Sequence, residues 1–294
     1  MDDVLRRAPD IHAVGYFGVL IVLLIVEAIV PRRHGGDALA TRWFGNVMIA
    51  ALDVAITRAM FPIAALALSI LCLERGWGLF NVVPLQTWFV RLSTVLLLDL
   101  AVYVQHYTLH RVGFLWRLHR AHHTDPEFDV TTGLRFHPLE SVLATGVTLV
   151  VILAVGAPPV AVLIWQVLSG ALNFVEHMNV RLPSRFDRLL RLLLVTPDMH
   201  RIHHSAAPGE SRMNLANMFS FWDRLFGTYL AEPTGGPDSI VFGLADFADP
   251  KHLRVHWILA QPFLPDRADG ARASSADDTT ATDRAYDFAA TARK

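Results

Sequence analysis

The chain contains apolar stretches that are long enough to cross a lipid bilayer. The first is residues 13–30 (AVGYFGVLIVLLIVEAIV), and Pro31, Arg32 and Arg33 follow it. A helix rises about 1.5 Å per residue, so about 20 apolar residues span a hydrocarbon core about 30 Å thick. Because no small-residue cleavage site follows the stretch, the pattern predicts a membrane helix rather than a cleaved signal peptide.

The second apolar stretch, residues 46–73, is longer than one membrane span requires and carries Asp53 and Arg58. Charged groups are costly inside a bilayer unless they pair with each other or reach its surface. We therefore expect an interfacial helix at 43–55 followed by a membrane span at 56–73. Pairing of the two charges inside the helical bundle is the alternative.

Three later stretches extend the predicted bundle. Residues 88–105 form one segment, with Asp99 in its last third, and residues 141–156 and 160–175 meet at the sequence GAPP. Glycine and proline stop a helix and permit the chain to reverse. The last two stretches should therefore form a membrane hairpin that returns to the side on which it started.

Composition agrees with a membrane location. Of the 294 residues, 53% are apolar and only 18% are charged, and the mean hydropathy is +0.36, which is high for a soluble domain. The net charge of −1, without a basic block, gives no indication of nucleic-acid binding. A single cysteine, Cys72, excludes an internal disulfide, a thiolate zinc cluster and an iron–sulfur centre. The predicted fold is an all-α integral membrane bundle of about four or five segments with a histidine-rich helical cap.

One histidine pattern, HxxHH, occurs twice in the chain. A sequence with 14 histidines in 294 residues should contain it about 0.03 times by chance. On a helix, positions i, i+3 and i+4 share one face, so each copy presents three imidazoles side by side. Imidazole is a ligand for zinc, copper, iron and nickel, and the two copies are interpreted as two halves of one metal site. These histidines are His119, His122 and His123 in the first copy and His200, His203 and His204 in the second.

Four further histidines lie in the same part of the chain. His106 and His110 form an i, i+4 pair upstream of the first copy, and His177 stands alone between the two copies. His137 precedes Pro138, so it either binds metal or caps the helix that the proline begins. Structural histidines do not usually cluster in this way, and the pattern therefore favours a metal site built mainly from imidazoles.

These motifs resemble the fatty acid hydroxylase and sterol desaturase superfamily of membrane di-iron oxygenases. The resemblance covers about residues 95–230, and the first 90 residues match it only in being hydrophobic. The segments that carry it are 99–111 (DLAVYVQHYTLHR), 115–123 (LWRLHRAHH), 131–140 (TTGLRFHPLE), 176–179 (EHMN), 196–204 (TPDMHRIHH) and 221–229 (FWDRLFGTY).

The resemblance implies two iron ions that activate O2 to hydroxylate or desaturate a lipid. Its ligands would be the eight histidines of the three boxes together with His177. Some members of the superfamily have a further histidine four residues before the isolated ligand, where this chain has Asn173. We expect that contact to be weaker or replaced by water. Tyr107 and the segment 214–217 (NLAN) also depart from the common pattern, and these departures concern the substrate more than the metal.

Ligating histidines usually donate their second ring N–H to a carboxylate or a carbonyl group. Carboxylates close to the histidine motifs in the sequence are the candidates for this role, and Asn173 lies among them near His177. The carboxylates are Asp99, Asp125, Glu140, Glu176 and Asp198.

Breaking an unactivated C–H bond requires a metal and O2, because no side chain can do it. The expected substrate is a membrane lipid: a sterol-like lipid, a fatty acyl chain, or an ether or amino lipid. The sequence contains no dinucleotide fingerprint and no haem module, so electrons should come from a separate ferredoxin or from a cytochrome with its reductase. Zinc can take the place of iron in a purified sample.

Two other classes of His-rich membrane protein compete with this interpretation. A metal transporter should hold its ligands near the bilayer midplane on broken helices. A zinc hydrolase needs three ligands, an open position and a base, as in HExxH, and that motif does not occur in this sequence.

Arginine counts predict the orientation of the protein. The loop 31–45 carries three arginines and the loop 74–87 one, so the positive-inside rule places the histidine motifs on the cytoplasmic face and the N-terminus outside. The predicted domain organisation is N-terminal membrane helices at 1–90, a catalytic domain at 91–232 with a membrane hairpin at 141–175, a C-terminal extension at 233–264 and a disordered tail at 265–294.

Overall fold

The computed structural model describes residues 2–61 and 63–265, and these residues are mostly helical. Within these two ranges no strand is formed, and extended pairing is limited to two isolated bridges, Leu194 with Phe219 and Ser205 with Phe242. The all-α prediction is therefore confirmed. Residues up to Pro262 form one compact unit. The tail predicted at 265–294 lies outside the described residues apart from Pro265.

Five helical segments are long and apolar enough to cross a membrane, which confirms the predicted multi-pass character. They are Ala8–Ile29, Leu39–Val82, Thr87–Arg111, Pro138–Val155 and Pro159–His177. The first combines α2 (Ala8–Ala13), a π-helical turn (Val14–Gly18) and α3 (Val19–Ile29), which follow the short α1 (Asp2–Arg6). The second combines α4 (Leu39–Met60), α5 (Ala65–Arg75) and α6 (Leu79–Val82).

The helix boundary expected between 55 and 56 is wrong. α4 runs without interruption from Leu39 to Met60, and the chain leaves the helix at Phe61, where φ is −123° and ψ is 85°. The next residue in the sequence is a proline, whose ring disfavours the helical conformation of the residue before it. The predicted segments 43–55 and 56–60 therefore belong to one helix.

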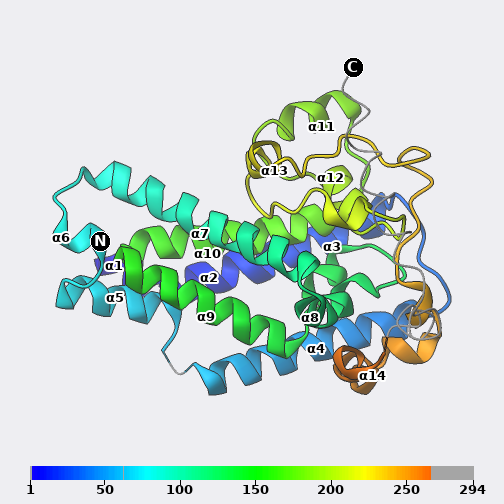
Figure 1. The fold of residues 1–294 in the computed structure, drawn as a ribbon, viewed down its shortest axis with the longest axis horizontal. Helices are drawn as coiled ribbons and strands as arrows, with labels where there is room; N and C mark the ends of the chain where they lie inside the picture. Colours follow the sequence, from blue (N-terminus) through cyan, green and yellow to red (C-terminus); the bar gives the residue numbers. More distant parts are fainter. Residues whose placement is uncertain (1, 62, 266–294) are drawn as a thin grey trace, which may run out of the picture. The chain divides into compact units, whose positions relative to one another are not determined.

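α7 (Thr87–Arg111), α9 (Pro138–Val155) and α10 (Pro159–His177) form the centre of the bundle (Figure 1). α9 packs against α4, α5 and α7, and α10 packs against α5 and α7. The α9–α10 hairpin turns at Gly156, where φ is +65° and a Cβ would lie 2.4 Å from the Trp77 carbonyl oxygen. The turn therefore needs glycine at this position, and the predicted hairpin is present.

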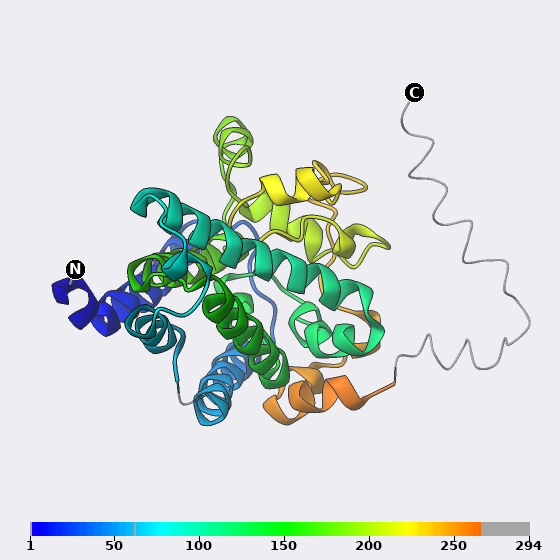
Figure 2. The ribbon, with the colours of Figure 1, turned by 60° about the vertical axis from the view of Figure 1, so that its left-hand side comes forward.

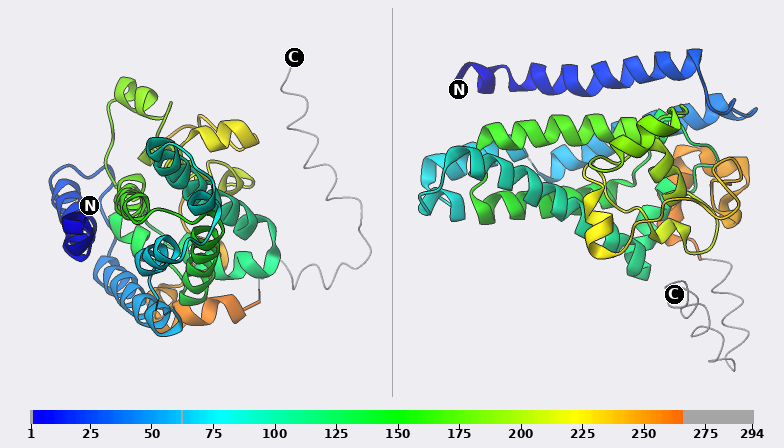
Figure 3. Two further views of the ribbon diagram at one scale, coloured as in Figure 1. Left: turned by 90° about the vertical axis from the view of Figure 1, so that its left-hand side faces the viewer. Right: turned by 90° about the horizontal axis from the view of Figure 1, so that it is seen from above.

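The chain between these helices and after them forms a cap at one end of the bundle, as the views in Figures 2 and 3 agree. α1 lies at the opposite end. The cap helices are α8 (Gly113–His123), η2 (Val130–Leu134), α11 (Ser184–Leu190), α12 (Pro197–His203), η3 (Glu210–Arg212), α13 (Phe221–Phe226), η4 (Ala245–Phe247), η5 (Pro250–Leu253), α14 (Val255–Ala260) and η6 (Gln261–Phe263).

A buried polar network joins the cap to α4. The Arg42 guanidinium, 1% exposed, bonds Asp125 at 2.8 Å and also Asp129. Asp125 further accepts hydrogen bonds from Asn46 and Thr132, each at 3.0 Å. Buried carboxylates need such partners, because an unpaired charge away from water is costly. The network therefore fixes the chain that directly follows the first HxxHH copy.

Candidate metal centre

The two HxxHH copies lie at the ends of two helices of the cap. The first ends α8, and the second occupies most of α12, which begins with Pro197 at the first helical position and Thr196 as its N-cap. Proline is pre-organised for this position, and the threonine hydroxyl accepts a hydrogen bond from the free Met199 N–H. Local sequence thus produces the helices that place three imidazoles on one face.

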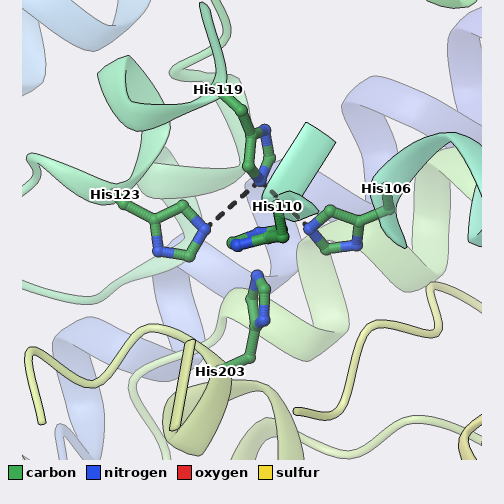
Figure 4. Close-up of side chains that lie close together, drawn as sticks. All are labelled: His106, His110, His119, His123 and His203. Atoms are coloured by element: carbon green, nitrogen blue, oxygen red, sulfur yellow. Dashed lines mark hydrogen bonds between the residues drawn. The ribbon is translucent and has the colours of Figure 1, made fainter. Parts of the chain in front are cut away.

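The structure brings nine histidines together in two groups. Within each group, one ring nitrogen per histidine lies within 4.8 Å of those of all other members. In Figure 4 the five rings of the first group point toward a common centre. The first group is His106, His110, His119, His123 and His203; the second group is His122, His177, His200 and His204.

Each HxxHH copy contributes to both groups. His119 and His123 belong to the first group, whereas His122, between them, belongs to the second. The second copy does the reverse, with His200 and His204 in the second group and His203 in the first. In each group, the i, i+4 pair of one copy thus lies with the single i+3 histidine of the other copy. Each copy therefore supplies ligands to both groups instead of forming half of one site.

The proton positions in the first group follow from the partners of the outer ring nitrogens. His106 Nδ1 lies 2.8 Å from the Leu215 carbonyl oxygen, and His119 Nδ1 lies 2.7 Å from Glu140 Oε1. These oxygens accept hydrogen bonds, so both Nδ1 atoms carry the proton and both Nε2 atoms carry a lone pair. The two Nε2 atoms nevertheless lie only 3.0 Å apart. His123 Nε2 lies 3.2 Å from the same His119 atom.

The second group repeats this arrangement. His177 Nδ1 lies 2.6 Å from the Asn173 carbonyl oxygen, which leaves its Nε2 as the lone-pair nitrogen. That atom lies 3.2 Å from His122 Nε2 and 3.0 Å from His200 Nε2. His204 Nε2 completes the group at 3.1 Å from His200 Nε2.

These separations match the spacing of nitrogens around a metal ion. At a metal–nitrogen distance of about 2.1 Å, two ligands at right angles lie about 3.0 Å apart, and at the tetrahedral angle about 3.4 Å apart. Without an ion between them, the lone pairs of His106 and His119 would only repel each other at 3.0 Å. A cation at each centre turns this repulsion into coordination, so the donor set fits a metal at both positions.

Burial keeps the imidazoles outside the membrane spans neutral. Burial lowers the pKa of each of these imidazoles well below its ordinary value, because the charged form loses its hydration. Neighbouring histidines lower the pKa further, because a second positive charge beside the first would be repelled. A neutral imidazole is the form that binds a metal. The residues concerned are His122, His123, His200, His203 and His204.

The carboxylates proposed from sequence as partners of the ligands lie in different places. Glu140 contacts His119 directly, and Glu176 lies 3.9 Å from Nδ1 of both His177 and His200. Asp125 lies in the Arg42 network instead.

Two of these carboxylates have partners outside the histidine groups. Asp198 pairs with Arg32, and Asp99 accepts hydrogen bonds from the Trp222 indole at 2.8 Å and the Phe219 N–H. Asn173 uses its backbone oxygen on His177, while its side-chain amide donates to the Gly133 carbonyl at 2.9 Å.

His137 lies outside both groups. Its Nδ1 accepts a hydrogen bond from the Leu139 N–H at 3.2 Å, and its Nε2 lies 3.3 Å from the Leu259 carbonyl oxygen. Nδ1 thus caps α9, as the capping alternative predicts, and Nε2 links the helix end to α14.

Backbone carbonyl groups orient further ligands. The Leu215 carbonyl oxygen accepts a hydrogen bond from His106 Nδ1, and the Met213 carbonyl oxygen accepts one from His203 Nδ1 at 3.1 Å. The turn that carries them is held by Asp223, which accepts from the N–H groups of Leu215 at 2.7 Å and Ala216 at 3.2 Å. Carbonyl groups leave no signal in residue types, and sequence reasoning missed both of them.

A cavity of about 260 Å³ opens beside the two groups, on the side of the membrane helices. Its walls come from α7, α9 and α10, and it touches His106 and His119 of the first group and three ligands of the second. Polar side chains from these helices and from the 216–217 turn complete the lining: Gln105, Glu140, Ser141, Thr145, Thr148, Asn173, Glu176 and Asn217. The cavity therefore adjoins both histidine groups.

Comparison with known proteins gives matches to the same part of the chain. Residues 91–228 match the sequence model of the fatty acid hydroxylase family. Alkylglycerol monooxygenase of Caenorhabditis elegans is 30% identical over 50% of this chain and 28% of its own length. Ornithine lipid hydroxylase OlsE of Rhizobium tropici is 28% identical over 56% of this chain and 47% of its own length.

The human alkylglycerol monooxygenase is 29% identical over 54% of this chain and 33% of its own length. The chain thus spans less than half the length of each of these curated relatives. No solved structure matches it.

Proposed function

We propose that the chain belongs to the fatty acid hydroxylase family and is a membrane-bound, non-haem di-iron oxygenase that hydroxylates a lipid. The observation that carries the proposal is the pair of buried imidazole groups with lone pairs facing one another at 3.0–3.2 Å. Five and four donors are enough to hold two iron ions and leave room for O2.

The bound irons would supply the oxidising power that side chains lack. Hydroxylation consumes one lipid C–H bond, one O2, two electrons and two protons, and it yields one hydroxyl group and one water. The chain's own part is to hold the metals, keep the imidazoles neutral and position the lipid in the cavity below them. Desaturation would use the same site, with loss of a second hydrogen from the substrate in place of hydroxyl transfer.

Two properties of this proposal follow from the position of the site. Arg32, Arg33 and Arg42 contact residues of the cap, and by the positive-inside rule this end of the bundle faces the cytoplasm. Ferredoxins and cytochromes with their reductases supply electrons on that side, and one of them would be the donor.

The other two classes receive less support. Nine donors in two groups exceed the three ligands of a hydrolytic zinc, and the groups lie at helix ends instead of the bilayer midplane that a transporter requires.

Metal analysis and lipid profiling test the proposal together. The detergent-solubilised protein from iron-supplemented cells should contain two irons per chain, and cells that express it under ¹⁸O2 should accumulate a lipid with one labelled hydroxyl group. His203→Ala should lose both properties, whereas His256→Ala, which changes an exposed histidine of the cap, should keep them. One zinc per chain, no iron and an unchanged lipid profile would overturn the proposal.

A further inference from the structure

An apolar groove of about 500 Å³ runs along the outer side of the α7–α9 pair. α9 contributes one residue per turn, and α7 contributes the facing row, with Leu115 of α8 at the cap end. Both helices are candidate membrane spans, so the groove opens toward lipid. The lining of the two long helices is Leu97, Leu100, Ala101, Val104, Gln105, Thr108, Leu109, Leu143, Val147, Val151 and Val155.

The groove adjoins the cavity beside the histidines. Gln105 and Leu109 line both spaces, and they are followed directly in the chain by the ligands His106 and His110. Leu109 is buried, at 2% exposed, so it forms the wall between groove and cavity. A ligand that passes this wall would have one part in the groove and another at the metal positions.

The length of the groove corresponds to one hydrocarbon chain. Leu143 and Val155 lie twelve residues apart on α9, which is about 18 Å at 1.5 Å per residue. One leaflet of a bilayer has a hydrocarbon thickness of about 15 Å, half of the core. A groove of this length therefore suits a single hydrocarbon chain of a lipid from the leaflet on the cap side.

Polarity changes along this path. Beyond Val104 and Val147, away from the cap, the groove lining is entirely apolar, whereas the cap end carries Gln105 and Thr108 and the adjoining cavity carries Thr145. The Gln105 amide is half-buried and forms no hydrogen bond within the part of the chain that the structure describes. An unpaired amide at the entrance to the cavity suits a ligand with a polar group at that depth.

We propose that this groove binds a single alkyl or acyl chain of a lipid from the cap-side leaflet, with the polar end of the lipid at Gln105 and the histidines. The orientation follows from the apolar far end, which accepts only hydrocarbon. This orientation places the oxidised carbon in the head group of the lipid or among the first carbons of its chain. The position of the oxidised carbon rests on the proposed function. A mid-chain carbon would reach the metals only if the polar end left the interface.

Photocrosslinking tests the orientation without relying on activity. The probes are two alkylglycerol ethers in phosphatidylcholine vesicles, one with a diazirine near the glycerol and one with a diazirine at the chain terminus. The near-glycerol probe should label residues around 105 and 141–145, and the terminal probe should label 97–101 and 151–155. The reverse order, or equal labelling of all lipid-facing helices by both probes, would overturn the proposal.

A matched pair of variants on α9 tests the groove itself. Val147→Trp fills the groove and should reduce labelling by the terminal probe about tenfold, because methylene groups of the probe lose their burial. Val150→Trp places the same side chain on a lipid-exposed position, 66% exposed and outside both spaces, and should leave labelling unchanged. Equal labelling of the two variants would contradict the assigned groove.

The labelling experiment distinguishes failure of the proposed oxygenase function from failure of the proposed groove. The labelling pattern of His203→Ala should equal that of the unaltered protein, since the groove does not depend on the metals. A protein that keeps the pattern but contains no iron and oxidises no lipid would refute the oxygenase and retain the chain-binding groove. A protein that oxidises a lipid at mid-chain would keep the oxygenase and refute the orientation.

Discussion

Glu140→Gln should weaken metal binding in the first histidine group while leaving the fold intact. The Glu140 carboxylate accepts the Nδ1–H of His119 at 2.7 Å, and both side chains are nearly buried, with 6% and 3% exposed. This contact holds the ring with its lone pair toward the metal position. Glutamine has the same shape, so the substitution changes the charge and the hydrogen-bonding groups and little else.

The size of the effect follows from the surroundings of the carboxylate. Loss of the charge removes about 1 kcal/mol from the hydrogen bond. Oε2 is buried without a hydrogen-bond partner, so an NH2 group in its place would be buried unpaired at a cost of about 1–3 kcal/mol. If the amide turns over to avoid this cost, it donates to Nδ1, which moves the ring proton to Nε2 and blocks coordination by His119.

Both orientations of the glutamine predict a loss of metal affinity of about 10-fold to 100-fold. The measurement is competition between the purified protein and a chelator of known affinity, with metal per chain determined at each step. Glu127→Gln is the control, because Glu127 accepts the Gly36 N–H at 2.7 Å and lies near Arg42 rather than the histidines. Affinities of Glu140→Gln and the unaltered protein that agree within about twofold, or 0.4 kcal/mol, would refute the positioning role.

Two further substitutions and a change of pH test the buried contacts that hold the histidines in place. Arg42→Met leaves Asp125 and Asp129 buried without their cation, so the free energy of unfolding should fall by about 3–5 kcal/mol in denaturant titrations, whereas exposed Arg254→Met should change it little. Gly133→Ala brings a Cβ to 3.0 Å from Asn173 Nδ2 and 3.3 Å from His177 Nδ1, and metal retention should fall relative to Gly113→Ala, where no neighbour lies within 4 Å. In the metal-free protein the buried imidazoles of the cap have lowered pKa values, so the unfolded chain binds more protons below pH about 6.5, and the melting temperature should decrease steadily as the pH falls through that value. A melting temperature that stays constant from pH 7.5 to 5.5 would contradict this account of the cap.

Features that depend on short stretches of sequence could be predicted. The HxxHH spacing places imidazoles on one helix face whatever surrounds the helix, and the GAPP turn produces the hairpin through the conformational limits of glycine and proline. The exception is the helix break near residue 60: the charges of Asp53 and Arg58 indicated an earlier boundary, but the helix continues to Met60, directly before Phe61 and the proline that follows it in the sequence. Side chains within α4 can meet polar groups of neighbouring helices, and Asp53 lies within hydrogen-bonding reach of Ser141 and Thr57.

Features that depend on packing between distant segments could not be predicted. The division of the nine histidines into two groups is set by how α8 and α12 face each other, and sequence spacing within one helix does not contain that angle. Asp125 and Asp198 are close to histidines in the sequence, but arginines of the N-terminal half, Arg42 and Arg32, pair with them. The carbonyl groups of Leu215 and Met213 became partners of the ligands because the 213–216 turn folds over the site.

The exchange of histidines between α8 and α12 makes the two metal positions thermodynamically dependent on each other. Each helix carries ligands for both positions, so an ion that binds at one position fixes the orientation of both helices. The second ion then meets ligands that have already lost their freedom to turn, and it binds without that entropy cost. Loading should therefore be cooperative, and protein with a single ion should be a minor state near the midpoint of a metal titration.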